Sequence, residues 1–301
     1  MLGATATAAQ RRERFRELLN GSEIVQFPGA INPLNAQLIE QAGFEGVYIS
    51  GGAFSAAQGL PDIGLTTLTE VVDHGRAIAR VTNLPTFIDA DTGWGEAMNV
   101  ARTVQEFEDA GLSGIHLEDQ VNPKRCGHLD GKEVVTTAEM VKRISAAAKG
   151  RRDENFVLCA RTDARAGEGL DAAIDRAKAY ADAGADMIFP EAMRDLGEFE
   201  TFAKALDVPI LANMTEFGKS ELFTTSQLAD AGVRVVIYPV TTLRLAMGAI
   251  KDGLQAIRTE GTQASVVDRM QTRADLYETI DYEAYNAFDA AVFNFSQEGH
   301  Q

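Results

Sequence analysis

Two acidic residues at positions i and i+2, Asp89 and Asp91, lie at the end of a short apolar run and have the spacing of a metal site. Alternate side chains of a strand point to the same face, so both carboxylates can face one interior. Two carboxylates held together repel each other unless protons or a cation neutralise them. Mg²⁺ suits such a pair, because it binds one or two protein carboxylates and keeps several waters, which Glu118 and Glu191 could hold. The alternative is that Asp89 bonds within its own turn and only Asp91 is functional.

A thiol within a basic segment is the second chemical feature, because Cys126 lies in the sequence Lys124-Arg125-Cys126-Gly127-His128. Cationic neighbours lower the pKa of a thiol and give either a reactive thiolate or an acid that can donate its proton. Cys, His and a nearby Asp could also form a hydrolase triad. A solvated basic loop with an incidental cysteine is the third interpretation, and spacing alone leaves all of them open.

The charge balance limits what the chain can bind. There are 28 Lys and Arg residues against 44 Asp and Glu residues, with a formal net charge of −16 and a pI near 4.7. Nucleic-acid binding requires a basic surface, so this balance argues against it, and it argues weakly against anionic membranes. An acidic substrate must be held by a few local cations, since Arg forms forked pairs with carboxylates. Arg161, at a predicted strand end, is the best candidate, whereas spacing leaves Arg244 and Arg273 as ordinary solvated helix residues.

The cysteine content favours a reducing compartment. Cys126 and Cys159 are the only cysteines, too few for a disulfide framework or a zinc cluster, so we expect a cytoplasmic protein. No apolar run approaches the length of a membrane span. The segment from Met1 to Asn20 mixes Arg with Glu and lacks the apolar region of a secretory signal, so we expect it to form an amphipathic helix.

A repeated order of helix, Ala-Gly pair and short apolar run predicts the secondary structure. Gly at the end of a helix stops it in the left-handed region, and a β-rich run follows each pair. Further apolar runs lie between these, which gives eight predicted strands, each followed by a helical stretch. The predicted strands span residues 24–27, 47–50, 86–90, 114–118, 156–160, 187–190, 210–213 and 233–238.

This alternation predicts a (β/α)₈ barrel. Strands that alternate with helices are parallel and joined by helical crossovers, and eight such units favour a closed barrel of the triosephosphate isomerase (TIM) type. No Gly-x-Gly-x-x-Gly turn supports a dinucleotide-binding fold. We predict one domain over residues 1–301, with an N-terminal helical segment at 1–22 and a C-terminal helical extension at 264–301. The aromatic extension must pack on this barrel or on a neighbouring subunit.

Polar residues collect at the predicted strand ends, where barrel enzymes carry their chemistry. A solvated rim is polar anyway, but acids or amides end nearly every strand here. The sequence thus favours a barrel enzyme with a divalent metal, a reactive cysteine and local cations for a multiply charged acid, without identifying the reaction. The strand-end residues are Tyr48, Ser50, Gly51, Gly52, Asp89, Asp91, Glu118, Asp119, Arg161, Asp163, Glu191, Asn213, Thr215 and Tyr238.

Motifs along nearly the whole chain resemble those of the isocitrate lyase and phosphoenolpyruvate mutase superfamily. The segment Lys124–His128 resembles its signature loop, and Arg125 is similar to the form found in 2-methylisocitrate lyases, since isocitrate lyases usually carry Lys there. The length is also similar to that of the short methylisocitrate lyases. The other matching segments are Tyr48–Gly52, Gly59–Asp62, Asp89–Gly93, Glu118–Gln120, Ala160–Asp163, Ala212–Gly218 and Met270–Arg273.

The resemblance implies a Mg²⁺-dependent lyase that cleaves the tricarboxylate 2-methylisocitrate to pyruvate and succinate, a step of propionate breakdown in the methylcitrate cycle. The sequence does not distinguish Mg²⁺ from Mn²⁺. Asp89 and Asp91 would hold the metal directly or through water, with Glu118 in the outer shell. Lyases of isocitrate or 2,3-dimethylmalate are the nearest alternative, whereas Cys126 argues against phosphonate or oxaloacetate enzymes. An inactive barrel that binds acids is the alternative from another class.

The resemblance also implies roles for single residues. Cys126 would donate a proton to the succinate half, while Tyr48 and Lys124 would take part in catalysis. Backbone N–H groups of the segment Ser50–Gly52 would hold the pyruvate carboxylate. The other implied catalytic or substrate-binding residues are Asp62, Gly127, His128, Arg161, Glu191, Asn213, Thr215, Arg244 and Arg273.

Two larger-scale features follow from the same resemblance and from the loop sequence. The family implies a homotetramer in which neighbouring subunits exchange their C-terminal helices. The loop that carries Cys126 is flanked by Gly127 and Gly131, and we predict that it closes over the substrate to exclude water.

Overall fold

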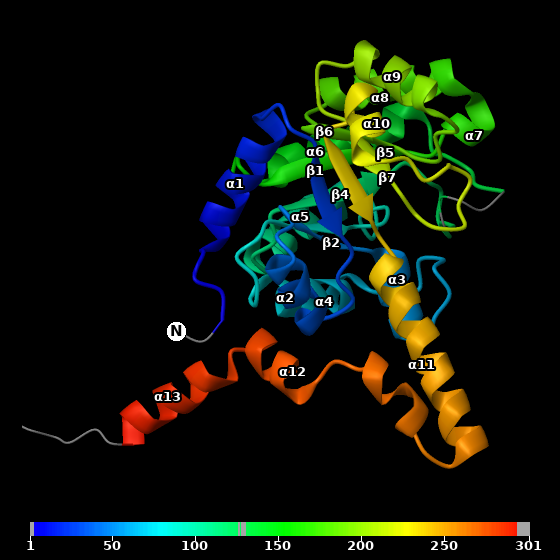
Figure 1. Ribbon diagram of the computed structural model, residues 1–301. Helices are drawn as coiled ribbons and strands as arrows, with labels where there is room; N and C mark the ends of the chain where they lie inside the picture. The colour runs from blue at the N-terminus through cyan, green and yellow to red at the C-terminus, as the bar shows by residue number, and fades with distance from the viewer. Residues whose placement is uncertain (1–2, 126, 128–130, 294–301) are drawn as a thin grey trace, which may run out of the picture.

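Eight parallel strands form a closed ring in the computed structural model, which describes residues 3–125, 127 and 131–293 (Figure 1). Hydrogen bonds order them as β1-β8-β7 and β2-β3-β4-β5-β6. Parallel bridges from Gly29 to Tyr48 and from Ile188 to Ile210 join the two sets, which confirms the predicted barrel. The strands are β1 (Val25–Pro28), β2 (Val47–Ile49), β3 (Thr86–Asp89), β4 (Gly114–Glu118), β5 (Val157–Thr162), β6 (Met187–Pro190), β7 (Leu211–Asn213) and β8 (Val235–Tyr238).

Helices alternate with these strands, and the Ala-Gly pairs end them as predicted. Gly111 has φ +85° and Gly184 has φ +111°, a backbone conformation that a residue with a side chain rarely adopts. The helices are α1 (Ala8–Asn20), α2 (Pro33–Gln41), α3 (Gly51–Ala57), α4 (Leu68–Ala79), α5 (Ala97–Asp109), α6 (Thr137–Gly150), α7 (Arg165–Glu168), α8 (Leu170–Asp182), α9 (Leu196–Ala205), α10 (Thr225–Asp230), α11 (Thr241–Glu260), the 3₁₀ helix η1 (Ala264–Arg269), α12 (Arg273–Thr279) and α13 (Tyr282–Phe293).

Helix α1 closes the N-terminal end of the ring. Its side chains Phe15, Leu18 and Leu19 are buried among the inward-facing residues of the strands. The ring of Phe15 lies 5.0 Å from that of Phe27 and 5.7 Å from that of Phe87. Close apolar packing resists small displacements. The strands that carry the polar residues at their opposite ends are therefore held rigidly.

Buried arginines fasten α1 to the barrel, and we expect Arg12→Met to lower its stability. Arg12 donates to the carbonyl of Leu112 at 2.9 Å and to the carboxylate of Asp153 at 2.9 Å. The variant removes a donor from the buried carbonyl of Leu112 and from the partly buried carboxylate of Asp153, which costs about 2–4 kcal/mol. Thermal unfolding measures the loss, and Arg14→Met is the matched control because Arg14 is exposed. Equal melting temperatures for the two variants would show that Arg12 does not hold the helix in place.

The chain leaves the barrel after β8. Helix α11 projects away from the ring, and the segment from η1 to α13 then runs back past α2 (Figure 1). Apolar side chains along α11 face solvent, with Leu245 69 % and Leu254 63 % exposed. An apolar groove of about 370 Å³ lies beside β1, β8 and α2 and is lined by residues such as Leu38 and Phe44. In the part of the chain that the structure describes, these side chains of α11 stay exposed and the groove stays open.

Across the described residues, no helix has the length and apolar character needed to cross a membrane.

Candidate active site

A cavity of about 100 Å³ lies at the C-terminal ends of the strands. Parallel strands in a closed ring direct these ends to one face, so residues far apart in the sequence meet there. Most of the residues predicted from strand ends and motifs are among its walls. The lining consists of Tyr48, Ser50, Gly52, Asp62, Asp89, Gly127, Arg161, Phe189, Glu191, Asn213, Thr215, Pro239, Val240 and Arg244.

The acidic side of the cavity is built where β3 ends. The carboxylates of Asp89 and Asp91 are both buried, and the backbone N–H of Asp91 donates to Asp89 Oδ1 at 2.9 Å. Asp89 therefore accepts a hydrogen bond within its own turn, which was the alternative to the metal-site interpretation of this spacing. Asp91 has φ +45°, a left-handed conformation that Asp and Asn tolerate better than most residues.

A lysine ammonium group and a glycine complete this acidic side. Lys124 Nζ lies 2.5 Å from Asp62 Oδ1 and 2.7 Å from Asp91 Oδ1. A methyl group on Gly51 would lie only 2.9 Å from Asp89 Oδ2 and 3.4 Å from Asp91 Oδ1. Glycine therefore keeps open the space beside the two carboxylates that any side chain would fill.

Burial dominates the ionisation of these groups. It raises the pKa of Asp91 to about 6 despite the attraction of Lys124, and it raises the pKa of Glu118 well above the usual value. Burial also raises the pKa of Asp89, but His116, Lys124, Arg161 and the hydrogen bond from the backbone N–H of Asp91 together outweigh it and hold that pKa below its usual value. Burial alone would lower the pKa of Lys124, whereas Glu118 and Asp91 raise it well above its usual range. The ionised carboxylates thus depend on nearby positive charge.

The acidic side fits a hydrated divalent cation. Glu118 Oε1 is buried and receives no hydrogen bond, and Asp91 Oδ1 is buried with the Lys124 ammonium group, 2.7 Å away, as its neighbour. Within the described ranges, no three His, Cys, Asp or Glu side chains converge as a complete ligand set. Mg²⁺ does not require such a set, because it binds through one or two carboxylates and keeps most of its waters. Asp89 and Asp91 could provide the direct ligands, and the Glu118 carboxylate could accept hydrogen bonds from the waters.

Arg161 is the central cation of the opposite side. Its guanidinium lies 3.2 Å from a carboxylate oxygen of Glu118, 3.2 Å from one of Glu191, and 2.9 and 3.1 Å from the two oxygens of Asp163. It also lies 5.2 Å from the centre of the Phe189 ring. Burial alone would lower the pKa of Arg161, but the three carboxylates raise it well above its usual value. This fixed positive charge is suited to an anionic group of a substrate.

Tyr48 and His116 form a buried pair beneath the cavity. Tyr48 Oη and His116 Nε2 are 2.8 Å apart, and the same ring nitrogen lies 3.7 Å from Asp89 Oδ1. Burial lowers the pKa of His116 to about 4 and raises that of Tyr48 well above 10, so both groups are neutral at pH 7. The tyrosine hydroxyl can then donate to the imidazole or accept from it, depending on the tautomer.

Helix α3 begins at the floor of the cavity. The side chain of Ser50 caps the helix by accepting from the backbone N–H of Ala53 at 3.2 Å. The first-turn N–H groups of Gly51 and Gly52 have no acceptor within the helix. They are thus available as donors, and their predicted binding of the carboxylate of the smaller product stays a prediction.

Of the remaining predicted residues, Arg244 reaches the cavity and Arg273 does not. Arg244 lies on its rim, 3.7 Å from Glu216 and 4.9 Å from the centre of the Phe217 ring. Arg273 is not part of the lining within one chain, because it begins α12, which packs on the outer helix α2. Cys126 and His128 lie outside the described residues, as do residues 129 and 130 of the loop predicted to close over the substrate.

Three residues near the cavity were not predicted as functional from sequence. His116 lies in the middle of β4, where an apolar run gives no sign of a partner on another strand. Gln120 and Lys132 contact the backbone of the loop that carries Cys126. Their only sequence signal is their place within or close to matching motifs, which does not indicate what each side chain touches.

Comparison with known proteins identifies the family. Residues 15–258 match the family described as phosphoenolpyruvate phosphomutase. A Corynebacterium glutamicum protein named "Probable 2-methylisocitrate lyase 2" is 58 % identical over 301 residues, which is all of this chain and 98 % of that protein. The Escherichia coli protein named "2-methylisocitrate lyase" is 49 % identical over 273 residues, covering 90 % of this chain and 92 % of that one.

Solved structures agree with this assignment. The crystal structure of 2,3-dimethylmalate lyase, a PEP mutase/isocitrate lyase superfamily member, matches with a TM-score of 0.89 and 30 % identity, covering 99 % of this chain and 100 % of that one. Phosphonopyruvate hydrolase in complex with oxalate and Mg²⁺ matches with a TM-score of 0.85 and 32 % identity, over 93 % and 98 % of the two chains. The chain therefore belongs to the 2-methylisocitrate lyases of the phosphoenolpyruvate mutase and isocitrate lyase superfamily.

Proposed function

We propose that this protein cleaves 2-methylisocitrate to pyruvate and succinate with the help of Mg²⁺, as a step of propionate breakdown. The observation that carries the proposal is the pairing of two sides in one cavity, a buried acidic pair beside Gly51 and a buried guanidinium at Arg161. Such a cavity can bind a metal at one end and a carboxylate at the other. Relatives at 58 % and 49 % identity that carry the name 2-methylisocitrate lyase support the choice of substrate.

Asp89 and Asp91 would hold the metal, with Glu118 orienting its waters. When bound, Mg²⁺ supplies Lewis-acid stabilisation of negative charge on the pyruvate half of the substrate. The phosphonopyruvate hydrolase structure with oxalate and Mg²⁺ supports this choice of metal. Mn²⁺ prefers similar oxygen ligands and is the second candidate.

The side chains then move protons and hold charge. Transfer of the substrate hydroxyl proton to a base lets the hydroxyl oxygen form the carbonyl of pyruvate while the C2–C3 bond breaks. The electron pair of that bond passes to the succinate half as a carboxylate-stabilised carbanion. Arg161 and Asn213 lie where they can donate to that charge. Tyr48, held by His116, would position the pyruvate half, and Cys126 would return a proton to the carbon of the succinate half. Ser50–Gly52 and Arg244 would hold the outer carboxylates.

The test is release of pyruvate from 2-methylisocitrate with Mg²⁺, with Mn²⁺ and with EDTA. We expect pyruvate and succinate in equal amounts, formed only when a divalent metal is present. Product formation that is unchanged by EDTA would refute the metal assignment. Absence of product under all conditions would refute the lyase assignment.

We further propose that the protein works in the cytoplasm as a homotetramer, in which each one-domain subunit lends α11 to a neighbour. In a barrel whose strands are each covered by the helix that follows, the helix after β8 would pack in the apolar groove beside β1, β8 and α2. Here α11 instead exposes Leu245 and Leu254 outside its own barrel. The exchange of α11 would cover both apolar surfaces. It would also give Arg273, which follows α11, a site to serve in a neighbouring subunit.

Sedimentation velocity tests this assembly. We expect a tetramer for the wild type and a smaller species for Leu254→Glu, because the variant places a charge on the apolar face of α11. Lys251→Glu on the same helix is the control and should remain tetrameric. A wild-type monomer at assay concentration would argue against the exchange.

A further inference from the structure

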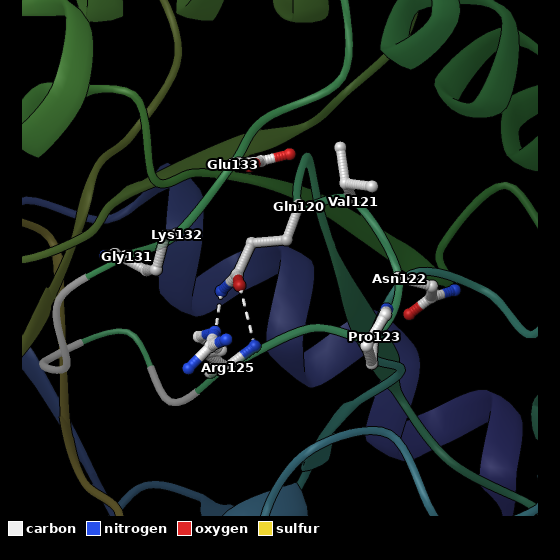
Figure 2. A pocket seen from close by; sticks show the side chains of 8 residues that line it. All are labelled: Gln120, Val121, Asn122, Pro123, Arg125, Gly131, Lys132 and Glu133. Atoms are coloured by element: carbon white, nitrogen blue, oxygen red, sulfur yellow. Dashed lines mark hydrogen bonds between the residues drawn. The ribbon is translucent and has the colours of Figure 1, made fainter.

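Two polar side chains fasten the backbone on either side of position 126. Gln120 follows β4 after Asp119, and Lys132 lies on the segment that returns from the loop (Figure 2). We propose that Gln120 and Lys132 are positioning residues that hold the backbone of Arg125 and Gly127 against Arg161 and thereby set the rate of the reaction. Only the kinetic part of this inference rests on the proposed lyase function.

Gln120 holds the residue before position 126. Its side chain is 1 % exposed, and its amide makes two hydrogen bonds with one loop residue. The backbone N–H of Arg125 donates to Gln120 Oε1 at 2.8 Å, and Gln120 Nε2 donates to the carbonyl of Arg125 at 2.8 Å (Figure 2). Paired bonds of opposite direction fix both the position and the orientation of the backbone of Arg125. A buried amide used in this way determines where the loop backbone lies.

Lys132 holds the residue after position 126. Its buried ammonium group donates to the carbonyl of Gly127 and lies 2.6 Å from Asp163 Oδ1. The same carboxylate of Asp163 binds Arg161 through two hydrogen bonds of 2.9 and 3.1 Å. Asp163 is itself fixed, because its backbone N–H donates to Asp119 Oδ1 at 2.9 Å. The loop backbone and the central cation of the cavity are therefore tied to one carboxylate.

The loop backbone at Gly127 lies too close to the cavity for a side chain to fit there. A methyl group at this position would overlap both the guanidinium of Arg161 and the carboxylate of Glu191. The loop backbone thus lies in direct contact with the proposed charge-binding groups. A misplacement of about 1 Å in such a position can slow a reaction on the order of 100-fold. The alternative is that both side chains only anchor a surface loop, which predicts no effect on the rate.

The kinetic test compares Gln120→Leu and Lys132→Met with matched controls. We expect kcat to fall about 10- to 100-fold and KM to change less than ~3-fold, since orientation is lost while the binding groups remain. Lys132→Arg keeps a charged donor and should recover part of the rate. The controls are Gln105→Leu, whose amide donates to Gly150 far from the cavity, and Lys204→Met, whose ammonium is exposed beside Glu200. Wild-type kcat in both test variants, or an equal fall in the controls, would overturn the proposal.

Limited proteolysis gives a readout that needs no substrate. The side chain of Arg125 is exposed, and trypsin cleaves after arginine. We expect cleavage after Arg125 to be on the order of 10-fold faster in Gln120→Leu and Lys132→Met. The digestion is run well below the melting temperature of each variant, because Lys132→Met also removes a buried partner of Asp163 and lowers stability. Cleavage at the wild-type rate would contradict a holding role. If the wild type has no lyase activity, the proposed function fails, and this experiment still decides whether the two side chains hold the loop.

Discussion

An Arg161→Met variant is expected to be almost inactive and clearly less stable than the wild type. Arg161 is buried and contacts the carboxylates of Glu118, Asp163 and Glu191. Its removal leaves buried negative charge without compensation, which costs about 3–5 kcal/mol of folding free energy. It also removes the donor proposed for the departing carboxylate, and the loss of one such donor lowers kcat on the order of 100- to 1,000-fold. Thermal unfolding and the pyruvate assay measure the two effects.

Two further variants separate charge from geometry at this position. Arg161→Lys keeps the positive charge but cannot form forked pairs, so we expect stability to recover more than activity. Arg152→Met is the matched control, because the guanidinium of Arg152 is half exposed beside Glu108 and Asp109. A wild-type melting temperature for Arg161→Met would mean that the three carboxylates do not rely on this cation.

Asp91→Asn is expected to lose metal-dependent activity while keeping its fold. Asn has the shape of Asp and tolerates the φ of +45° at this position, so the backbone can stay unchanged. Removal of one of two adjacent buried carboxylates relieves repulsion, so we expect the melting temperature without metal to be unchanged or higher. Loss of a direct metal ligand should lower kcat by about 1,000-fold or more, since metal stabilisation is worth several kcal/mol.

Metal binding can be measured here without turnover. A ligand that binds only the folded state raises the melting temperature, so Mg²⁺ should stabilise the wild type and not Asp91→Asn. Asp73→Asn, which changes an exposed carboxylate beside Arg76, should respond to Mg²⁺ as the wild type does. An equal Mg²⁺-induced shift in Asp91→Asn would place the metal elsewhere.

The barrel could be predicted because its signals are local. Each Ala-Gly pair ends a helix, and each apolar run that follows is short enough to be a strand. Several strand bounds differ from the prediction by one or two residues. The difference that affects the site is in β5, which continues through Arg161 and Thr162, although these residues were expected after the strand. The side chain of Arg161 still reaches the cavity, since a strand residue near the C-terminal end of a barrel can face inward.

The candidate site could be predicted as a set of residues and not as a set of contacts. Strand ends placed Asp89, Glu191 and Asn213 together, because a barrel brings all strand ends to one face. The bond between Tyr48 and His116 joins different strands, and no spacing within either strand indicates it. The same holds for Lys132, which reaches both Gly127 and a residue on the next barrel unit.

The direction of α11 likewise could not be predicted from the sequence. Its pattern is that of an amphipathic helix, and such a helix can cover its own barrel or another. The structure extends it away from the ring, which leaves its apolar side chains exposed (Figure 1). Only contacts between distant parts of the chain, or between chains, decide between these arrangements.

The most direct test of the central claim is the value of kcat/KM for 2-methylisocitrate, measured beside those for isocitrate and 2,3-dimethylmalate with Mg²⁺. Isocitrate lacks one methyl group, which is worth roughly 1–3 kcal/mol in an apolar pocket, so some activity on it is expected. 2,3-Dimethylmalate lacks one carboxylate, so it tests the groups that bind that charge. We predict that 2-methylisocitrate is preferred over both by about 10-fold or more. A higher kcat/KM for isocitrate or for 2,3-dimethylmalate would contradict the assignment and move this protein to another lyase of the same superfamily.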